Sequence, residues 1–231
     1  MQINYTLVTV EDARKDEQKI LEVLTAIMNN NLPDDLMLLN YHKEVPISFR
    51  PSIKIIDRGL VEMSVHKIQG IVMRMQKTTL IKSDHLPHAV IAKVQRIDTD
   101  SNLAFLSQFC YVTIPSDRRK YVRVQVSGRF DAHFRSKQKS IHGTIRDISI
   151  GGVAILAQAS NDIEVNTVGM VSMELSGIAA EIPGKLLRIN DENDEKKYAI
   201  ELEQGTKYEG LISKIITQQQ GEIIRELKEQ C

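Results

Sequence analysis

Short apolar runs separated by turn-forming residues fill most of this chain, and this pattern restricts its fold more than any other feature. Runs of a few residues bounded by Gly, Pro or Asp are typical of short strands, and a long series of them indicates a small antiparallel barrel or sandwich. In the first half, the predicted strands are residues 45–49, 52–56, 60–65, 68–73, 88–94 and 103–109. The pattern therefore predicts a mainly β protein.

The second half repeats the pattern and predicts a second small antiparallel β-barrel. In its first strand, valines alternate with Arg123 and Gln125, so the two-residue period of a strand turns Arg123 away from the core. Residues 190–195 are all Asn, Asp or Glu, which is typical of an exposed hairpin tip. The predicted strands of this half are residues 121–129, 140–148, 153–156, 168–175, 178–182, 185–189 and 198–202.

Amphipathic helices are predicted at the two ends of the chain. Residues 9–29 carry apolar side chains at helical spacing, with Thr9 and Asp12 as start signals and Pro33 beyond the stop. Residues 208–231 carry a second apolar stripe, and their polar face mixes both charges, which argues against a membrane-surface helix. We expect each helix to pack on its own domain, with a partner copy of the chain as the alternative.

The composition is typical of a soluble globular protein, with 42% hydrophobic and 26% charged residues. The formal net charge is +0, so no global field attracts nucleic acid or an anionic membrane. Because the sequence has neither an apolar run of about 18 residues nor a signal pattern, we expect a cytoplasmic protein. Cys110 and Cys231 are interpreted as free thiols, and Pro87 between His85 and His88 argues against a metal site.

A short linker, Thr-Ile-Pro-Ser at residues 113–116, separates the two β-rich halves. We therefore expect two domains. The first, residues 1–114, contains the N-terminal helix and a β-domain. The second, residues 115–231, contains a barrel and the C-terminal helix.

Four cations follow this linker within six positions: Arg118, Arg119, Lys120 and Arg123. The planar fork of arginine grips phosphate oxygens in pairs and matches the O6/N7 edge of guanine. On composition alone, such a cluster is more often a solvated face. Its significance depends on whether the chain also offers acceptors for a base.

A polar turn further along the chain offers such acceptors, since residues 147–152 read Asp-Ile-Ser-Ile-Gly-Gly. The carboxylate of Asp147 accepts from guanine N–H groups, Ser149 offers a hydroxyl, and Gly151 and Gly152 let a ligand approach bare backbone. A purely structural turn has the same composition and is the alternative. Together with the arginines, the turn predicts a site for a guanine nucleotide with more than one phosphate.

The two motifs together resemble those of PilZ domains. Arg119-Lys-Tyr-Val-Arg123 matches Arg-x-x-x-Arg, and Asp147-Ile-Ser-Ile-Gly-Gly152 matches Asp/Asn-x-Ser-x-x-Gly. The resemblance covers residues 115–231 and implies a six-stranded β-barrel that binds the bacterial second messenger cyclic di-GMP as a ligand, with no cofactor or metal. The preceding segment is similar to the N-terminal β-domain of flagellar-brake (YcgR-like) proteins. Ala199 stands where many members carry a glycine, which is expected to alter the shape of the pocket.

The resemblance implies a cyclic di-GMP receptor that is not an enzyme. Arg119 and Arg123 would hold phosphate and guanine, and Arg118 would reach the second half of the ligand. Asp147 and Ser149 would meet guanine and phosphate edges. Because the arginines emerge from the linker, binding at this hinge would change the orientation of the two domains.

By analogy with the flagellar brake, the output would be control of motility or of biofilm-related behaviour through a downstream protein. Flagellar motor components at the basal body are the candidate partners, and a homodimer is a further expectation. We expect neither nucleic acid nor membrane insertion among the interactions.

Three other functions fit the sequence less well. A nucleotide-independent PilZ adaptor, acting through protein–protein contacts, usually lacks the arginines that this chain keeps. A single-stranded nucleic-acid binder needs aromatic platforms along a basic groove, whereas this chain has no Trp and only 5% aromatic residues. An enzyme needs a nucleophile with its base or a pair of catalytic carboxylates, and no such set stands out in the sequence.

Overall fold

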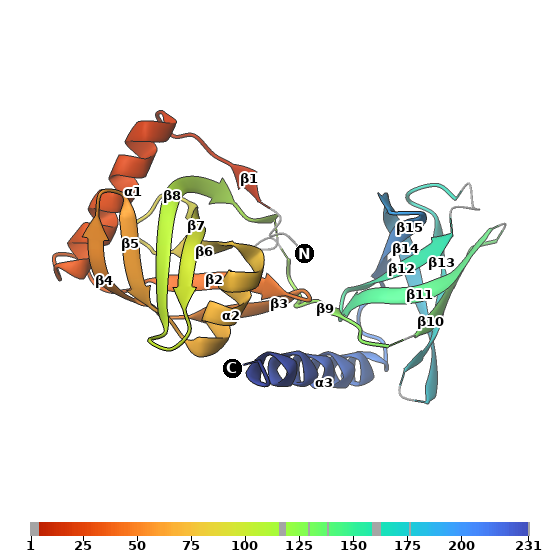
Figure 1. Ribbon diagram of the computed structural model, residues 1–231. Helices are drawn as coiled ribbons and strands as arrows, with labels where there is room; N and C mark the ends of the chain where they lie inside the picture. The colour runs from red at the N-terminus through yellow and green to blue at the C-terminus, as the bar shows by residue number, and fades with distance from the viewer. Residues whose placement is uncertain are drawn as a thin grey trace. The chain divides into compact units, whose positions relative to one another are not determined.

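The chain forms two compact units, and the computed structural model describes residues 5–115, 119–128, 130–137, 139–158, 163–175 and 177–230. The first unit comprises Met1–His42, Pro46–Arg119 and Arg225–Cys231, and the second comprises Lys43–Val45 and Lys120–Ile224. The division after Arg119 thus falls inside the Arg-x-x-x-Arg motif. The described residues hold three helices and two sheets (Figure 1).

An eight-stranded antiparallel sheet forms most of the first unit. Its strands are β1 (Thr6–Leu7), β2 (Met37–His42), β3 (Val45–Phe49), β4 (Ser52–Asp57), β5 (Leu60–Ser64), β6 (Thr78–Lys82), β7 (Ala89–Asp98) and β8 (Leu103–Thr113). The order is β3-β2-β6-β7-β8-β5-β4, and β1 pairs with β8. Of these strands, β1, β2 and β6 were not predicted from the sequence.

Helix α1 (Ala13–Met28) packs against β8 and β4 through the apolar stripe seen in the sequence. Asp12 caps it, since its side chain accepts from the N–H of Arg14 at 3.1 Å and of Lys15 at 3.0 Å. Asp12 itself has an extended backbone, with φ −150°. The sequence predicted that this helix begins at residue 9, but it begins at residue 13. Its buried apolar residues are Ile20, Leu24 and Ile27.

Helix α2 (Lys67–Gln76) overturns another prediction, because residues 68–73 form a helix and not a strand. The side chain of His66 caps its first turn, where Nδ1 accepts from the N–H of Ile68 at 3.3 Å. Residues 68–73 are all buried, and the helix contacts β2, β6 and β7. A helix enclosed in this way lacks the exposed polar face that makes a helical period visible in a sequence.

A buried polar network joins α2 to the sheet. Oδ1 of Asn40 accepts from Nε2 of Gln69 at 2.6 Å and from Oγ1 of Thr79 at 2.7 Å. The amide nitrogen of Asn40 donates to Oε1 of Gln76 at 2.7 Å and to the backbone oxygen of Thr78 at 2.8 Å. Asn40, Gln69 and Thr79 are 0% exposed. These bonds fix the helix at one place on the sheet, since each buried polar group needs its particular partner.

The second unit contains a closed antiparallel barrel of six strands. Its strands are β10 (Asp131–Arg135), β11 (Ser140–Ser149), β12 (Gly152–Gln158), β13 (Val168–Leu175), β14 (Ile178–Glu192) and β15 (Glu195–Leu202). The ring closes in the order β10-β13-β14-β15-β12-β11, because β10 pairs with both β13 and β11. The mainly β fold and the six-stranded barrel that the resemblance implied are confirmed.

Two details of the barrel differ from the prediction. The predicted strands 178–182 and 185–189 are one strand, β14, which continues to Glu192, so the hairpin tip is only the turn at residues 193–194. Asn193 in this turn has a positive φ of 57°, a conformation that asparagine tolerates better than most residues. Strand β10 was not predicted.

Strand β9 (Val124–Gln125) is all that forms of the predicted strand 121–129. The edge of β11 that faces away from β12 pairs with β10 over Ser140–Thr144, and in the rest of β11 only Asp147 and Ile148 pair with β9. The expected alternation also fails at residue 122, where the valine side chain is 47% exposed. Strand β9 is therefore short because few residues of β11 pair with it.

Helix α3 (Glu209–Lys228) follows the barrel, and the predicted C-terminal amphipathic helix is confirmed. Its buried residues are Ile212, Ile215, Ile216, Gln219, Ile223 and Leu227. None of the helices in the described part of the chain is both long enough and apolar enough to cross a membrane.

Candidate functional site

The pairing of β9 with β11 brings the two sequence motifs together. Gln125 lies opposite Asp147, and Val124 lies opposite Ile148. Arg123 immediately precedes this pairing and is half-buried. The end of the Arg-x-x-x-Arg motif thus lies beside the start of the Asp-x-Ser-x-x-Gly motif, although more than twenty residues separate them in the sequence.

The turn between β11 and β12 is closed by contacts of the motif's own residues. Ser149 pairs with Gly152, and its hydroxyl donates to the backbone oxygen of Gly152 at 3.2 Å. Ser149 is buried, with 5% of its surface exposed. A Cβ atom on Gly152 would lie 2.8 Å from the backbone oxygen of Ile200 on β15, so this position excludes a side chain. The Ser149 hydroxyl and the absence of a side chain at residue 152 both hold the turn in shape.

Tyr121 occupies the space above the other glycine of the turn. A Cβ atom on Gly151 would lie 2.7 Å from Cδ2 of the Tyr121 ring. The ammonium group of Lys120 lies over the same ring, 5.0 Å from its centroid, a distance at which a cation is attracted to the π face. The bare backbone at Gly151, which the sequence suggested for a ligand, is in contact with an aromatic side chain of the first motif.

Asp147 forms a close ion pair with Lys197 of β15. The distance from Lys197 Nζ to Asp147 Oδ2 is 2.6 Å, and the two side chains are 23% and 5% exposed, respectively. A buried carboxylate needs such a partner, because an unpaired charge away from water is costly. Sequence reasoning missed Lys197, since only the register of β15 with β12, and of β12 with β11, shows that it lies near Asp147.

Small residues lie between these two charged groups on the outer side of the barrel, where Ala154 is nevertheless only 3% exposed. Asp147, Ala154 and Ala199 lie in one row across β11, β12 and β15. Directly opposed residues of antiparallel strands point to the same face, and the adjoining row, Ile148 with Val153 and Ile200, is buried in the barrel. Ala199, expected from the family pattern to be a glycine, therefore belongs to a floor of small side chains on the outside of the barrel.

The structure describes only one of the remaining arginines of the predicted site. Arg119 is exposed and is assigned to the first unit, next to Lys120 in the chain. Arg118 lies outside the described residues. The second unit thus brings together Asp147, Ser149, Gly151, Gly152 and the segment that carries Arg123, and it adds Lys197 to this set.

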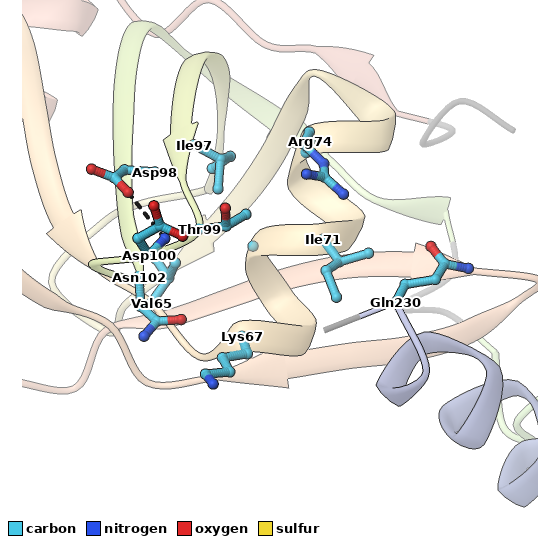
Figure 2. A pocket seen from close by; sticks show the side chains of 11 residues that line it. Val65, Lys67, Ile71, Arg74, Ile97, Asp98, Thr99, Asp100, Asn102 and Gln230 are labelled. Atoms are coloured by element: carbon cyan, nitrogen blue, oxygen red, sulfur yellow. Dashed lines mark hydrogen bonds between the residues drawn. The ribbon is translucent and has the colours of Figure 1, made fainter.

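A separate cavity of about 430 Å³ lies in the first unit, between α2 and the turn from β7 to β8 (Figure 2). Basic side chains of α2, Lys67 and Arg74, line it together with Asp98 and Asp100 of the turn. Asp98 accepts hydrogen bonds from the turn, chiefly from Ser101, and these lower the pKa of its carboxyl group. The Asp98 carboxylate thus stabilises the turn. None of the predicted site residues that the structure describes lines this cavity.

Metal ligands are not gathered anywhere in the part of the chain that the structure describes: it has no group of three or more His, Cys, Asp or Glu side chains placed to hold a metal ion. The site on the barrel therefore offers hydrogen-bonding groups and charges. Its donors and acceptors suit a ligand that presents both N–H groups and anionic oxygens.

The closed barrel and the two adjoining motifs define a PilZ domain. The PilZ domain family matches residues 117–218, so this part of the chain is similar to PilZ domains. The resemblance drawn from the two motifs is confirmed. The name of the matching family, PilZ domain, indicates no catalytic activity.

Three solved structures are similar to this chain over most of its length. YcgR from Escherichia coli, in complex with c-di-GMP, covers 96% of this chain and 100% of its own, at 11% identity and a TM-score of 0.46. The inhibitor of motility MotI/DgrA from Bacillus subtilis covers 80% and 95%, at 14% identity and a TM-score of 0.43. The MrkH–c-di-GMP complex from K. pneumonia covers 99% and 100%, at 14% identity and a TM-score of 0.43.

Among curated protein sequences, none matches this chain. A further structure of MrkH describes that protein as a c-di-GMP-dependent transcription regulatory factor. The expectation that nucleic acid is not a partner of the present chain stays a prediction.

Proposed function

We propose that this chain is a receptor for cyclic di-GMP that acts without enzymatic activity. The observation that carries the proposal is the pairing of Gln125 with Asp147, because it joins the arginine motif to the acceptor turn on one face of the barrel. YcgR and MrkH, which resemble the chain in fold, have been solved with this ligand bound.

Each motif residue has a role in this proposal. Arg119 and Arg123 hold phosphate and guanine, and Arg118 reaches the second half of the ligand. Asp147 accepts from the guanine N–H groups, while the buried Ser149 holds the turn and meets the phosphate edge. Gly151 and Gly152 keep the backbone of the turn open to the ligand, once the Tyr121 ring has moved from Gly151.

The proposed output is a change in the orientation of the two units. Arg118 and Arg119 precede the division of the chain after residue 119, and Arg123 follows it. A ligand gripped by all three arginines would fix the backbone dihedrals of the connecting segment, as in other hinge transitions. A downstream protein then reads the new orientation; flagellar motor components at the basal body are our candidates, with motility or biofilm-related behaviour as the outcome.

A second function, the nucleotide-independent adaptor, is favoured by one specific observation. Two groups of the protein already occupy the candidate site: Lys197 lies on Asp147, and Tyr121 lies on Gly151. If these contacts are permanent, the motif residues have a structural role, and the domain acts through protein–protein contacts alone.

Isothermal titration of the full chain with cyclic di-GMP distinguishes the two functions. We expect binding with micromolar affinity or better, and no heat with GTP at the same concentration. Arg119→Ala and Arg123→Ala each remove a charged hydrogen-bond donor, which costs about 1.5–3 kcal/mol, or about ten- to a hundredfold in affinity.

Arg58→Ala serves as the matched control, since this arginine lies in the turn between β4 and β5 and its side chain is 94% exposed. It should bind like the unchanged protein. Absence of binding by folded, unchanged protein would refute the receptor and leave the adaptor. Equal loss of affinity in all three arginine variants would show that binding is nonspecific.

A further inference from the structure

Lys197 is placed so that it and a guanine base need the same atoms of Asp147. The Watson–Crick edge of guanine presents two adjacent N–H donors, and a carboxylate receives both only with both of its oxygens. In the structure, the ammonium group of Lys197 lies 2.6 Å from Oδ2 of Asp147. The lysine thus holds one of the two oxygens that the base requires.

The register of the strands explains how a residue of β15 reaches β11. Strand β12 lies between them, and its outward position beside Asp147 is Ala154, whose small side chain leaves the path open. Lys197 is two residues from Ala199, which lies opposite Ala154, so Lys197 points to the same outward face. A larger residue at 154 would stand between the two charges.

The burial of the pair makes its exchange for a ligand energetically significant. A fully exposed ion pair contributes little to stability and would be displaced at little cost. Here the carboxylate is 5% and the lysine 23% exposed, so the pair is largely shielded from water. A base that binds both oxygens of Asp147 competes with the ammonium group for Oδ2, and its binding weakens or breaks this contact.

We propose that Lys197 is an affinity- and specificity-determining residue of the nucleotide site: it is an internal competitor that occupies Asp147 until a base with two adjacent donors displaces it. This inference rests on the proposed function and deepens it. Guanine replaces the ammonium group as a donor to the carboxylate, whereas adenine presents an acceptor at the corresponding edge and leaves Asp147 without its full set of partners. Lys197 thereby weakens binding of every ligand and most strongly disfavours those that are not guanine.

Titration of Lys197→Met with cyclic di-GMP tests the proposal, because methionine keeps the apolar stem and removes the charge. We expect this variant to bind about tenfold more tightly or better, since the ligand no longer has to break a charge-assisted hydrogen bond. Lys196→Met makes the same charge change at the adjacent residue of β15, which pairs with Ala157 and Asp191. It should bind like the unchanged protein.

A measurement on the unchanged protein covers the case in which Lys197→Met does not fold. Acetylation of lysine amines by an N-hydroxysuccinimide ester, followed by peptide mass spectrometry, reports whether Lys197 is engaged. We expect its acetylation to rise several-fold when cyclic di-GMP is added, with Lys196 unchanged as an internal reference.

Failure of this inference differs from failure of the proposed function. If the unchanged protein binds, but Lys197→Met binds equally or more weakly and Lys197 becomes no more reactive, the lysine is not a competitor and the receptor stands. If neither protein binds cyclic di-GMP, both proposals are overturned.

Discussion

The backbone N–H of Ser127 donates to Oε1 of Gln219 at 2.8 Å, which ties the segment after β9 to helix α3. Gln219 is buried, with 5% of its surface exposed. We expect Gln219→Leu to lower the free energy of unfolding by about 1–3 kcal/mol, because the Ser127 N–H then loses its partner. Urea unfolding measures this loss. Gln218→Leu is the control: its amide bonds to Glu222 at the surface, and a similar cost there would contradict the account.

The contact of Tyr121 with Gly151 predicts a coupled pair of substitutions. Gly151→Ala forces the ring away and should cost about 1–3 kcal/mol of unfolding free energy by overpacking. In a Tyr121→Ala background the same change should cost much less, so the two effects would not add. Gly221→Ala in α3 meets open space and should be neutral or stabilising. Strictly additive costs at 151 and 121 would show that the two residues do not touch.

The cross-strand pair His133 and His142 predicts a loss of stability in mild acid. Their ring centroids lie 4.8 Å apart on β10 and β11. Burial, with smaller contributions from His142 and Arg135, lowers the pKa of His133 below its usual value near 6.5. The unfolded chain therefore takes up this proton first, and stability falls as the pH drops below about 6.5.

Urea midpoints at a series of pH values between 7.5 and 5 measure this effect. His133→Gln should flatten the dependence, while His88→Gln in the first unit should leave it unchanged. A dependence that persists in His133→Gln would assign the acid sensitivity to other groups.

The polar network around Asn40 predicts an unequal effect of two amide substitutions in one sheet. Asn40→Ala leaves Gln69 and Thr79, both 0% exposed, without their shared acceptor, and we expect a loss of about 2–4 kcal/mol. Gln95→Ala removes an exposed amide that bonds to Ser107, and the loss should stay below about 1 kcal/mol. Thermal unfolding of the two variants compares them. Similar losses would mean that the network contributes no more than a surface bond.

Strands that follow simple alternation were predictable from the sequence, and one buried helix was not. In β13 and β15, buried and more exposed side chains largely alternate, so a two-residue period reveals them. Residues 68–73 of α2 are buried on every side, because the helix packs into the sheet through Gln69 as well as through apolar residues. A short apolar run cannot be told from a strand by its period alone, and the β-branched residues of this run then favour the wrong structure.

Some residues of the candidate site could likewise be predicted from the sequence, and others could not. Asp147, Ser149 and the glycines could be found because their types and spacing are local features of one turn. Lys197 could not, because it lies fifty residues after Asp147 and reaches it only through the register of three strands. The length of β9 was equally hidden, since it depends on how much of β11 is already taken by β10.

Strand β9 pairs with the barrel at two positions, and the N–H of Val126 donates to the oxygen of Arg146 at 3.3 Å; Gln125 and Ser127 also donate to the oxygen of Lys43 at 3.0 Å and to Gln219 at 2.8 Å. So short a ladder opens at a free energy well below that of global unfolding, while the closed ring of six strands stays intact. Opening of this ladder, together with the bond from Ser127 to Gln219, would free the segment that carries Arg123 while the barrel stays folded. In a receptor, such local opening would let the ligand leave while the barrel stays folded. The rate of ligand release would then set the duration of the signal.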